Sequence, residues 1–223
     1  MGAYSYYLPP KRKSLLKTFS INTWIILINV IFFIVTSTLL ILNKIPVDLI
    51  AIKPANILQG KYLWTFITSM FMHGGLFHLF ANMFSLLFIG SLIQKILGEK
   101  RYLIFYLISG LFAGAFFVLW TFVSPTDLNT FAVGASGALF GLVGLLILLT
   151  PNLPVYIMLI PIPIKMKYAG PGILVLLWLI SIAGDIPIGN TAHLSGLVAG
   201  LFYGLYLRNK FPNKVKQIGK IFS

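Results

Sequence analysis

The sequence contains no cysteine and little charge of any kind. The lack of cysteine excludes disulfides, a thiol nucleophile and thiolate metal sites. Only 9% of its 223 residues are charged, whereas 58% are hydrophobic. A soluble domain of this size needs far more polar surface. We therefore expect an integral membrane protein, and the spread of apolar residues along the chain favours one domain over residues 1–223.

Acidic residues are especially scarce, with four Asp and Glu against 17 Lys and Arg, which gives a net charge of +13. Such an excess can indicate nucleic-acid binding, but here the basic residues gather at the two ends of the apolar region. Nine of them flank it: Lys11, Arg12, Lys13, Lys17, Arg208, Lys210, Lys214, Lys216 and Lys220. Charge in these positions orients membrane helices. We expect the lipid bilayer as a partner and no nucleic acid.

Apolar segments predict an all-α polytopic bundle of six transmembrane helices, because a spanning helix needs about 20 apolar residues. The expected spans are 21–42, 76–97, 102–123, 136–150, 168–183 and 191–209. They leave a basic N-terminal segment (1–20), a six-helix core (21–209) and a basic tail (210–223). The first apolar run is too long for the hydrophobic part of a signal peptide and lacks a convincing cleavage site.

The positive-inside rule predicts the orientation of the bundle. With both termini inside, only Lys44, Lys53 and Lys61 lie outside. We therefore expect cytoplasmic N- and C-termini in a multi-pass protein of the cell membrane. Residues 44–71 are expected to form short amphipathic pieces in the outer interface. Four prolines in residues 151–166 break the helix on the inner side.

Ser136 begins the short fourth span, within the sequence Gly134-Ala135-Ser136-Gly137. Fifteen residues make a helix of about 22 Å, against about 30 Å of hydrocarbon. Because Pro151 ends this helix near the inner face, Ser136 should lie below the outer surface. Irregular backbone at that depth requires protein or water beside it, which predicts a water-filled pocket above the serine. A helix cap or a small packing residue is the alternative interpretation of this serine.

His193 lies at the outer end of the sixth span, above a stripe of glycines at helical spacing. The stripe comprises Gly196, Gly200 and Gly204, and the fourth span offers Gly137, Gly141 and Gly144. Glycines spaced in this way let helix backbones approach closely. Such packing would bring Ser136 to His193, as a general base requires. An interfacial histidine bonded to water is the alternative.

The four acids, Asp48, Glu99, Asp127 and Asp185, offer no obvious third member of a triad. Glu99 lies on the inner side, and the other three are expected in loops. The sequence therefore favours a Ser-His dyad. Asp185, the acid nearest to His193 in sequence, is the remaining candidate to orient its ring.

The second span carries His78 and Asn82, which share one helix face at spacing i, i+4. Both can donate hydrogen bonds, and with the Ser136 backbone N–H they would stabilise an oxyanion. His73 precedes Gly74-Gly75 and is expected to brace that loop. Two alternatives remain: a polar helix contact without chemistry, and a zinc site. We expect no metal, because the H-E-x-x-H motif is missing and His73 and His78 do not share a helix face.

Three motifs together resemble the rhomboid family of intramembrane serine proteases. They are His73…His78…Asn82, Gly134-Ala135-Ser136-Gly137 and Ala192-His193…Gly196…Gly200, which match the family's H-x4-H-x3-N, G-x-S-G and A-H-x2-G-x3-G in order and on the expected spans. The match covers roughly residues 20 to 208.

The resemblance implies that Ser136 is the nucleophile and His193 the base. It implies that His78 and Asn82 form the oxyanion hole with support from His73. It also implies cleavage of transmembrane protein substrates without a cofactor. Substrate would enter past the fifth span, under a cap loop around residues 186–188.

Two positions depart from the family pattern. Trp64 is followed by Thr65 where many members have arginine, so the structural role of that arginine is missing or replaced. Phe140 stands where a tyrosine is often found against the histidine, and it can still stack on the imidazole. A non-catalytic chaperone or adaptor that binds transmembrane segments is the alternative function. A transporter is disfavoured because the inner halves of the spans are nearly all apolar.

Overall fold

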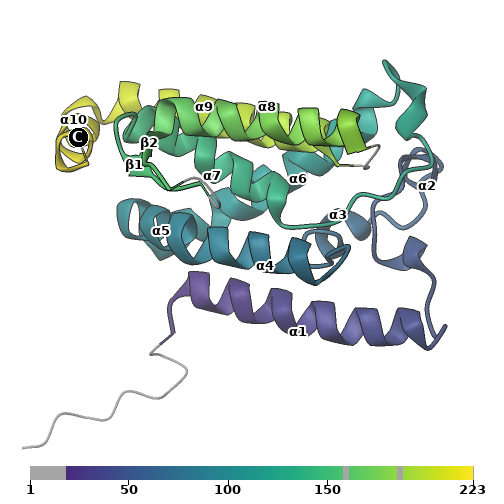
Figure 1. Cartoon of the computed structure of the whole chain (residues 1–223). Coiled ribbons are helices and arrows are strands. Elements are labelled where there is room, and N and C mark those ends of the chain that lie inside the picture. The colour runs from purple at the N-terminus through teal and green to yellow at the C-terminus, as the bar shows by residue number, and fades with distance from the viewer. Residues whose placement is uncertain (1–18, 158–160, 185–187, 223) are drawn as a thin grey trace, which may run out of the picture.

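The computed structural model describes residues 19–157, 161–184 and 188–222 and is mostly helical. The long helices lie side by side in a bundle (Figure 1). They are α1 (Ile21–Ile41), α4 (Leu76–Ser85) with α5 (Ser91–Leu97), α6 (Glu99–Trp120), α7 (Ser136–Leu149), α8 (Met166–Gly184) and α9 (Asn190–Lys210). A π-helical segment, Leu86–Gly90, joins α4 to α5 into one continuous rod. The helix bounds lie close to those expected from hydrophobicity.

Four rods in the described part of the chain are long and apolar enough to cross a membrane: α1, α4 through α5, α6 and α8. α7 is a shorter apolar helix of 14 residues. α9 has 21 residues but is more polar, with Asn190 and His193 at its start and Arg208 and Lys210 in its last turn. The first described helix begins, and the last one ends, at the same end of the bundle, which is the left end in Figure 1. The count of six spans and the direction of insertion stay predictions.

α7 lies at the centre of the bundle, where nearly all of its residues are buried. Leu142, Leu145 and Leu146 are fully buried. A helix that is apolar on all sides is buried on all sides. α7 therefore holds its first residue, Ser136, in a fixed position among its neighbours.

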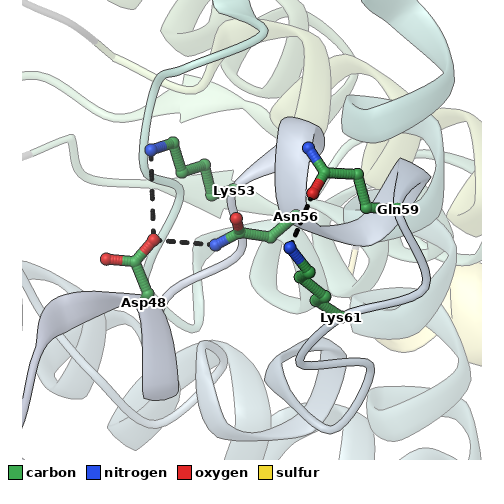
Figure 2. Close-up of polar contacts among 5 residues, drawn as sticks. All are labelled: Asp48, Lys53, Asn56, Gln59 and Lys61. Carbon is green, nitrogen blue, oxygen red and sulfur yellow. Dashed lines mark hydrogen bonds and ion pairs between the residues drawn. The ribbon is translucent and has the colours of Figure 1, made fainter.

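The segment between α1 and α4 forms short helical pieces: η2 (Val47–Leu49), α2 (Pro54–Leu58) and α3 (Thr65–Thr68). Asp48 accepts a hydrogen bond of 2.7 Å from the Asn56 amide and lies 3.9 Å from the Lys53 ammonium (Figure 2). The Lys61 ammonium donates to Gln59 beside this group. These partly exposed contacts contribute little stability, about 0–1 kcal/mol each, but they fix the shape of the loop.

Backbone hydrogen bonds attach this segment to the loop that leads into α7. Ile52 and Ala132 exchange two of them, of 3.1 and 2.8 Å, and Ala55 donates to the carbonyl of Leu128. The short helical pieces thereby support the chain just before Ser136.

Two small features add to the expected helical bundle. Residues Pro154–Val155 (β1) and Ile164–Lys165 (β2) pair as an antiparallel ladder after α7. The prolines end the helix as expected, and two short extended segments that follow it pair with each other. The expected basic tail contains a helix, α10 (Pro212–Ile221). Its apolar residues recur at helical spacing, and Val215 and the preceding Phe211 pack against the core.

A buried polar cluster joins α1 to the π-helical segment. The Asn22 amide donates to the carbonyl of Leu86 at 2.8 Å and to the Ser91 hydroxyl at 3.1 Å, and Tyr102 donates to the Asn22 carbonyl oxygen. A side chain added at Gly90 would overlap both Asn22 and Tyr102. The wide π turn frees a carbonyl, and Asn22 satisfies it. The N-terminal segment 1–18, with its four basic residues, lies outside the described residues.

Candidate active site

Ser136 is the first residue of α7 and follows a tightly held loop. Gly134 has φ +119°, a conformation that suits glycine. Its amide donates to the carbonyl of Ser69 at 2.8 Å. Ser136 is half-buried. The first amide N–H groups of a helix have no intrahelical partner, which leaves the Ser136 N–H available to a ligand.

The hydroxyl oxygen of Ser136 lies 2.7 Å from Nε2 of His193. The two residues are 57 positions apart in the sequence and come from α7 and α9. The His193 imidazole is buried and stacks on the Phe140 ring, with ring centroids 4.7 Å apart and planes at 22°. Phenylalanine thus supports the histidine without a hydroxyl. This geometry suits proton transfer from the serine to the imidazole.

Glycines bring α7 and α9 into backbone contact beneath this pair. A Cβ on Gly196 would overlap the carbonyl oxygen of Gly137, and a Cβ on Gly200 would overlap that of Gly141. On the other side of α7, a Cβ on Gly141 would overlap the Ser109 hydroxyl of α6. Any side chain at Gly196 or Gly200 would therefore push the two helices apart and lengthen the distance from Ser136 to His193.

Nδ1 of His193 has no hydrogen-bond partner among the described residues. Asp48 bonds to Asn56 in the first loop, and Glu99 begins α6. Asp127 lies in the 3-10 turn Pro125–Asp127. Asp185 lies outside the described residues, as do residues 186 and 187 of the expected cap loop. Within the described part of the chain, no carboxylate is hydrogen-bonded to the His193 ring.

His78 and Asn82 lie on α4, and the His78 ring faces the loop before Ser136. A Cβ added at Gly134 would lie 2.8 Å from Nε2 of His78 and 3.6 Å from the Ser136 hydroxyl oxygen. The side chains of His78 and Ser136 therefore both lie next to Gly134. The Asn82 amide nitrogen donates to the carbonyl of His78 at 2.8 Å, which uses one of its two hydrogens. The amide of Gly74 approaches Nδ1 of His78 at 3.4 Å. That contact favours a neutral ring with its proton on Nε2, toward the serine.

His73 lies in the loop before α4 and is buried, with 1% of its surface exposed. Its ring meets the edge of the His78 ring at a centroid distance of 5.1 Å and also contacts Phe33 of α1. Burial, with a smaller contribution from His78, lowers the pKa of His73 to about 4. His73 is therefore neutral at pH 7 and acts as packing behind His78.

The Trp64-Thr65 pair is held by its own contacts. The Trp64 indole donates to the carbonyl of Leu49 at 3.0 Å, and the buried Thr65 hydroxyl donates to the carbonyl of Tyr62. Thr68, one turn on, donates to the carbonyl of Ile50. These bonds tie the first loop together without an arginine at position 65.

The described residues contain no group of three or more His, Cys, Asp or Glu side chains that could hold a metal ion. His73 and His78 lie side by side, but His193 directs Nε2 to Ser136 instead. The arrangement is suited to nucleophilic attack by a hydroxyl with an imidazole as base, next to a set of hydrogen-bond donors.

The anchoring role of Ser69 was not predicted from the sequence. Its carbonyl oxygen fixes Gly134 and hence the entry to α7. Every residue has a backbone carbonyl, so the residue type at position 69 does not predict this contact. The buried position of Ser69 is the signal that the structure adds.

A model of the Rhomboid domain matches residues 60–210, which include all of the residues described above from His73 to His193. This chain belongs to the rhomboid family. It is a multi-pass membrane protein, and the resemblance inferred from the three motifs is confirmed.

Relatives of the rhomboid chain occur in plants and bacteria. It is 34% identical over 160 residues to RHOMBOID-like protein 1 of Arabidopsis thaliana, covering 69% of this chain and 37% of the relative. It is 35% identical over 147 residues to RHOMBOID-like protein 5 of the same plant, covering 65% and 44%. Rhomboid protease GluP of Bacillus subtilis (strain 168) is 29% identical over 150 residues, covering 66% of this chain and 26% of that protein. The chain spans less than half the length of these relatives.

Proposed function

We propose that this rhomboid is an intramembrane serine endopeptidase that cleaves transmembrane segments of membrane proteins. The observation that carries the proposal is the 2.7 Å contact between the Ser136 hydroxyl and Nε2 of His193 at the start of a buried helix. A relative named as a protease, GluP, supports the same activity.

The reaction follows from the placement of these groups. Nε2 of His193 takes the proton as the Ser136 oxygen attacks the scissile carbonyl, and a tetrahedral oxyanion forms. The imidazolium then gives the proton to the leaving amine as the peptide bond breaks. A water molecule, deprotonated by the same imidazole, then attacks the acyl carbon. The bond from that carbon to the Ser136 oxygen breaks, the serine oxygen takes the proton from the imidazolium, and the second product leaves as a carboxylic acid. All steps use side chains of this chain and water, with no cofactor or metal.

The oxyanion is stabilised by donors around Gly134 in this mechanism. The Ser136 backbone N–H is one, Nε2–H of His78 is the second, and the Asn82 amide is the third. His73 supports the His78 ring from behind. Phe140 stacks on the His193 ring and holds its orientation during both proton transfers.

We infer that residues 1–223 form one domain in the cell membrane, with both termini in the cytoplasm. A relative from Arabidopsis thaliana is named RHOMBOID-like protein 6, mitochondrial, which makes a mitochondrial membrane the alternative location. Fractionation of tagged protein between membranes tests the location independently of activity.

Cleavage of a reporter with a transmembrane segment tests the activity directly. Purified protein in proteoliposomes is expected to release a product that is missing with Ser136→Ala, while Ser85→Ala, a matched change on α4, cleaves normally. Product release by Ser136→Ala at the wild-type rate would overturn the proposal.

A second candidate function is a non-catalytic adaptor that binds transmembrane segments. It is favoured by one relative, Inactive RHOMBOID-like protein 8 of Arabidopsis thaliana, which is 34% identical over 86 residues. An adaptor would bind the reporter segment without cutting it, and Ser136→Ala would leave binding unchanged. Co-purification of uncut reporter with the wild-type protein, and no product over a long incubation, would favour this function.

A further inference from the structure

An open apolar groove runs between α6 and α9, away from Ser136. Its volume is about 370 Å³, and its walls include Ile104, Ile108 and Phe112 of α6 and Ala199 and Phe202 of α9. Arg101, in the first turn of α6, lies at one end of it. The rest of the lining is almost entirely apolar. The groove therefore has a cation at one end and an apolar protein surface along the rest of its length.

A second, smaller hollow of about 120 Å³ adjoins the same arginine. Arg101 and Lys214 both line it, together with apolar residues of α5, α9 and α10. Neither cation forms an ion pair with an acidic side chain in the described part of the chain, where Lys53–Asp48 is the pair observed. Two positive charges without a carboxylate partner thus line one hollow, which shares Arg101 with the groove.

The length of the groove matches one leaflet of a membrane. Arg101 to Phe112 is eleven residues along α6, or about 16 Å at 1.5 Å per residue. This is about half of the roughly 30 Å of hydrocarbon in a bilayer. Charged groups at the membrane surface and apolar walls reaching the midplane are the features of a phospholipid site, and basic pockets between helices bind anionic headgroups.

We propose that this site binds one anionic phospholipid from the leaflet on the side of the chain termini. The phosphate lies between Arg101 and Lys214, and one acyl chain fills the groove between α6 and α9. Because Lys214 belongs to α10, the bound lipid ties this amphipathic helix to the bundle. The site is separate from the proposed catalytic pair, and its test does not depend on activity.

Native mass spectrometry of the delipidated full chain in a neutral detergent tests the proposal. Phosphatidylglycerol is expected to bind as one copy and more tightly than phosphatidylcholine with the same acyl chains. Arg101→Gln and Lys214→Gln should each weaken phosphatidylglycerol binding about fivefold, the effect of one cation at a membrane surface. Lys216→Gln, an exposed change on the same helix, is the matched control and should leave binding unchanged.

The groove is tested separately from the charges. Ala199→Leu narrows it and should weaken binding of both lipids, and retention of the wild-type unfolding temperature shows that the variant is folded. Glycerol phosphate at millimolar concentration should not displace the lipid. Equal affinity for the two lipids, or displacement of the lipid by glycerol phosphate, would overturn the proposal. So would an equal loss of lipid affinity in Lys216→Gln and Lys214→Gln. An Ala199→Leu variant that changes its oligomeric state and keeps its lipid affinity would also overturn it.

Discussion

Some residues at the site meet more than one structural requirement. Gly134 needs its positive φ, leaves room for the His78 ring and donates to Ser69. The meeting of Ser136 with His193 could be predicted from the sequence, because glycine spacing on two apolar segments implies close packing. The Asn22–Tyr102 contact could not, because its partners are 80 positions apart and neither stands in a recognisable motif.

His78 and Asn82 are expected to act on the transition state. His78→Ala and Asn82→Ala should each lower kcat by about 10²–10³-fold, the range found for loss of one oxyanion donor. Steady-state kinetics on a reporter peptide measure the effect, with KM changed far less. If both variants raise KM and keep the wild-type kcat, these residues bind substrate and do not stabilise the oxyanion.

His73 should make the folded state sensitive to acid. Its pKa is about 4 when folded and about 6.5 when exposed, so the unfolded state binds more protons between these values. The contribution of His73 to the free energy of unfolding is therefore fully present above about pH 6.5 and is lost as the pH falls toward 4. At pH 5 the loss from this residue is about 2 kcal/mol.

Thermal unfolding in detergent at pH 7 and pH 5 measures the effect of His73. His73→Gln cannot be charged and should show a smaller drop between the two pH values than the wild type. An equal drop in both proteins would show that other groups cause the acid sensitivity.

At the scale of elements, the sequence predicts the positions of the long helices and the short pieces between α1 and α4, but three smaller features do not follow from it. The rod from Leu76 to Leu97 begins and ends where expected. Its π-helical turn, the β1–β2 ladder and α10 were missed. The π turn depends on Asn22 from another helix, the ladder is only two residues long on each side, and α10 is polar enough to resemble a solvated tail.

The glycine contact between α7 and α9 should be intolerant of a methyl group. Gly196→Ala is expected to destabilise the protein by about 1–3 kcal/mol, because a Cβ would meet the Gly137 carbonyl and neither backbone can yield. Cleavage should fall together with stability as Ser136 and His193 separate. Thermal unfolding and reporter cleavage measure the two effects.

Gly172 of α8 is the matched control, since a Cβ there meets nothing within 4 Å. Gly172→Ala should be neutral or stabilising, by up to about 1 kcal/mol, because alanine favours the helix. Equal effects of Gly172→Ala and Gly196→Ala would show that the α7–α9 contact is not special.

For the whole molecule, the arrangement of basic residues predicts an even number of spans. Figure 1 shows that the first described helix begins and the last one ends at one side of the bundle, opposite the loop that carries α2. The natural sequence has no cysteine, so single cysteines can report on each side without background.

Lys44→Cys and Gln217→Cys place a thiol at an exposed position on each side. In intact cells, a membrane-impermeant maleimide should label Lys44→Cys and should label Gln217→Cys only after the cells are opened. Labelling of both in intact cells, or of Gln217→Cys alone, would contradict the six-span orientation.

The central claim is that His193 makes Ser136 a nucleophile, and covalent labelling tests it most directly. Intact-mass analysis after treatment with a serine-directed fluorophosphonate should show one adduct on the wild type, mapped to Ser136. The adduct should disappear with His193→Ala and persist with Ser85→Ala. An adduct that forms at the same rate without His193, or that maps to another serine, would contradict the account.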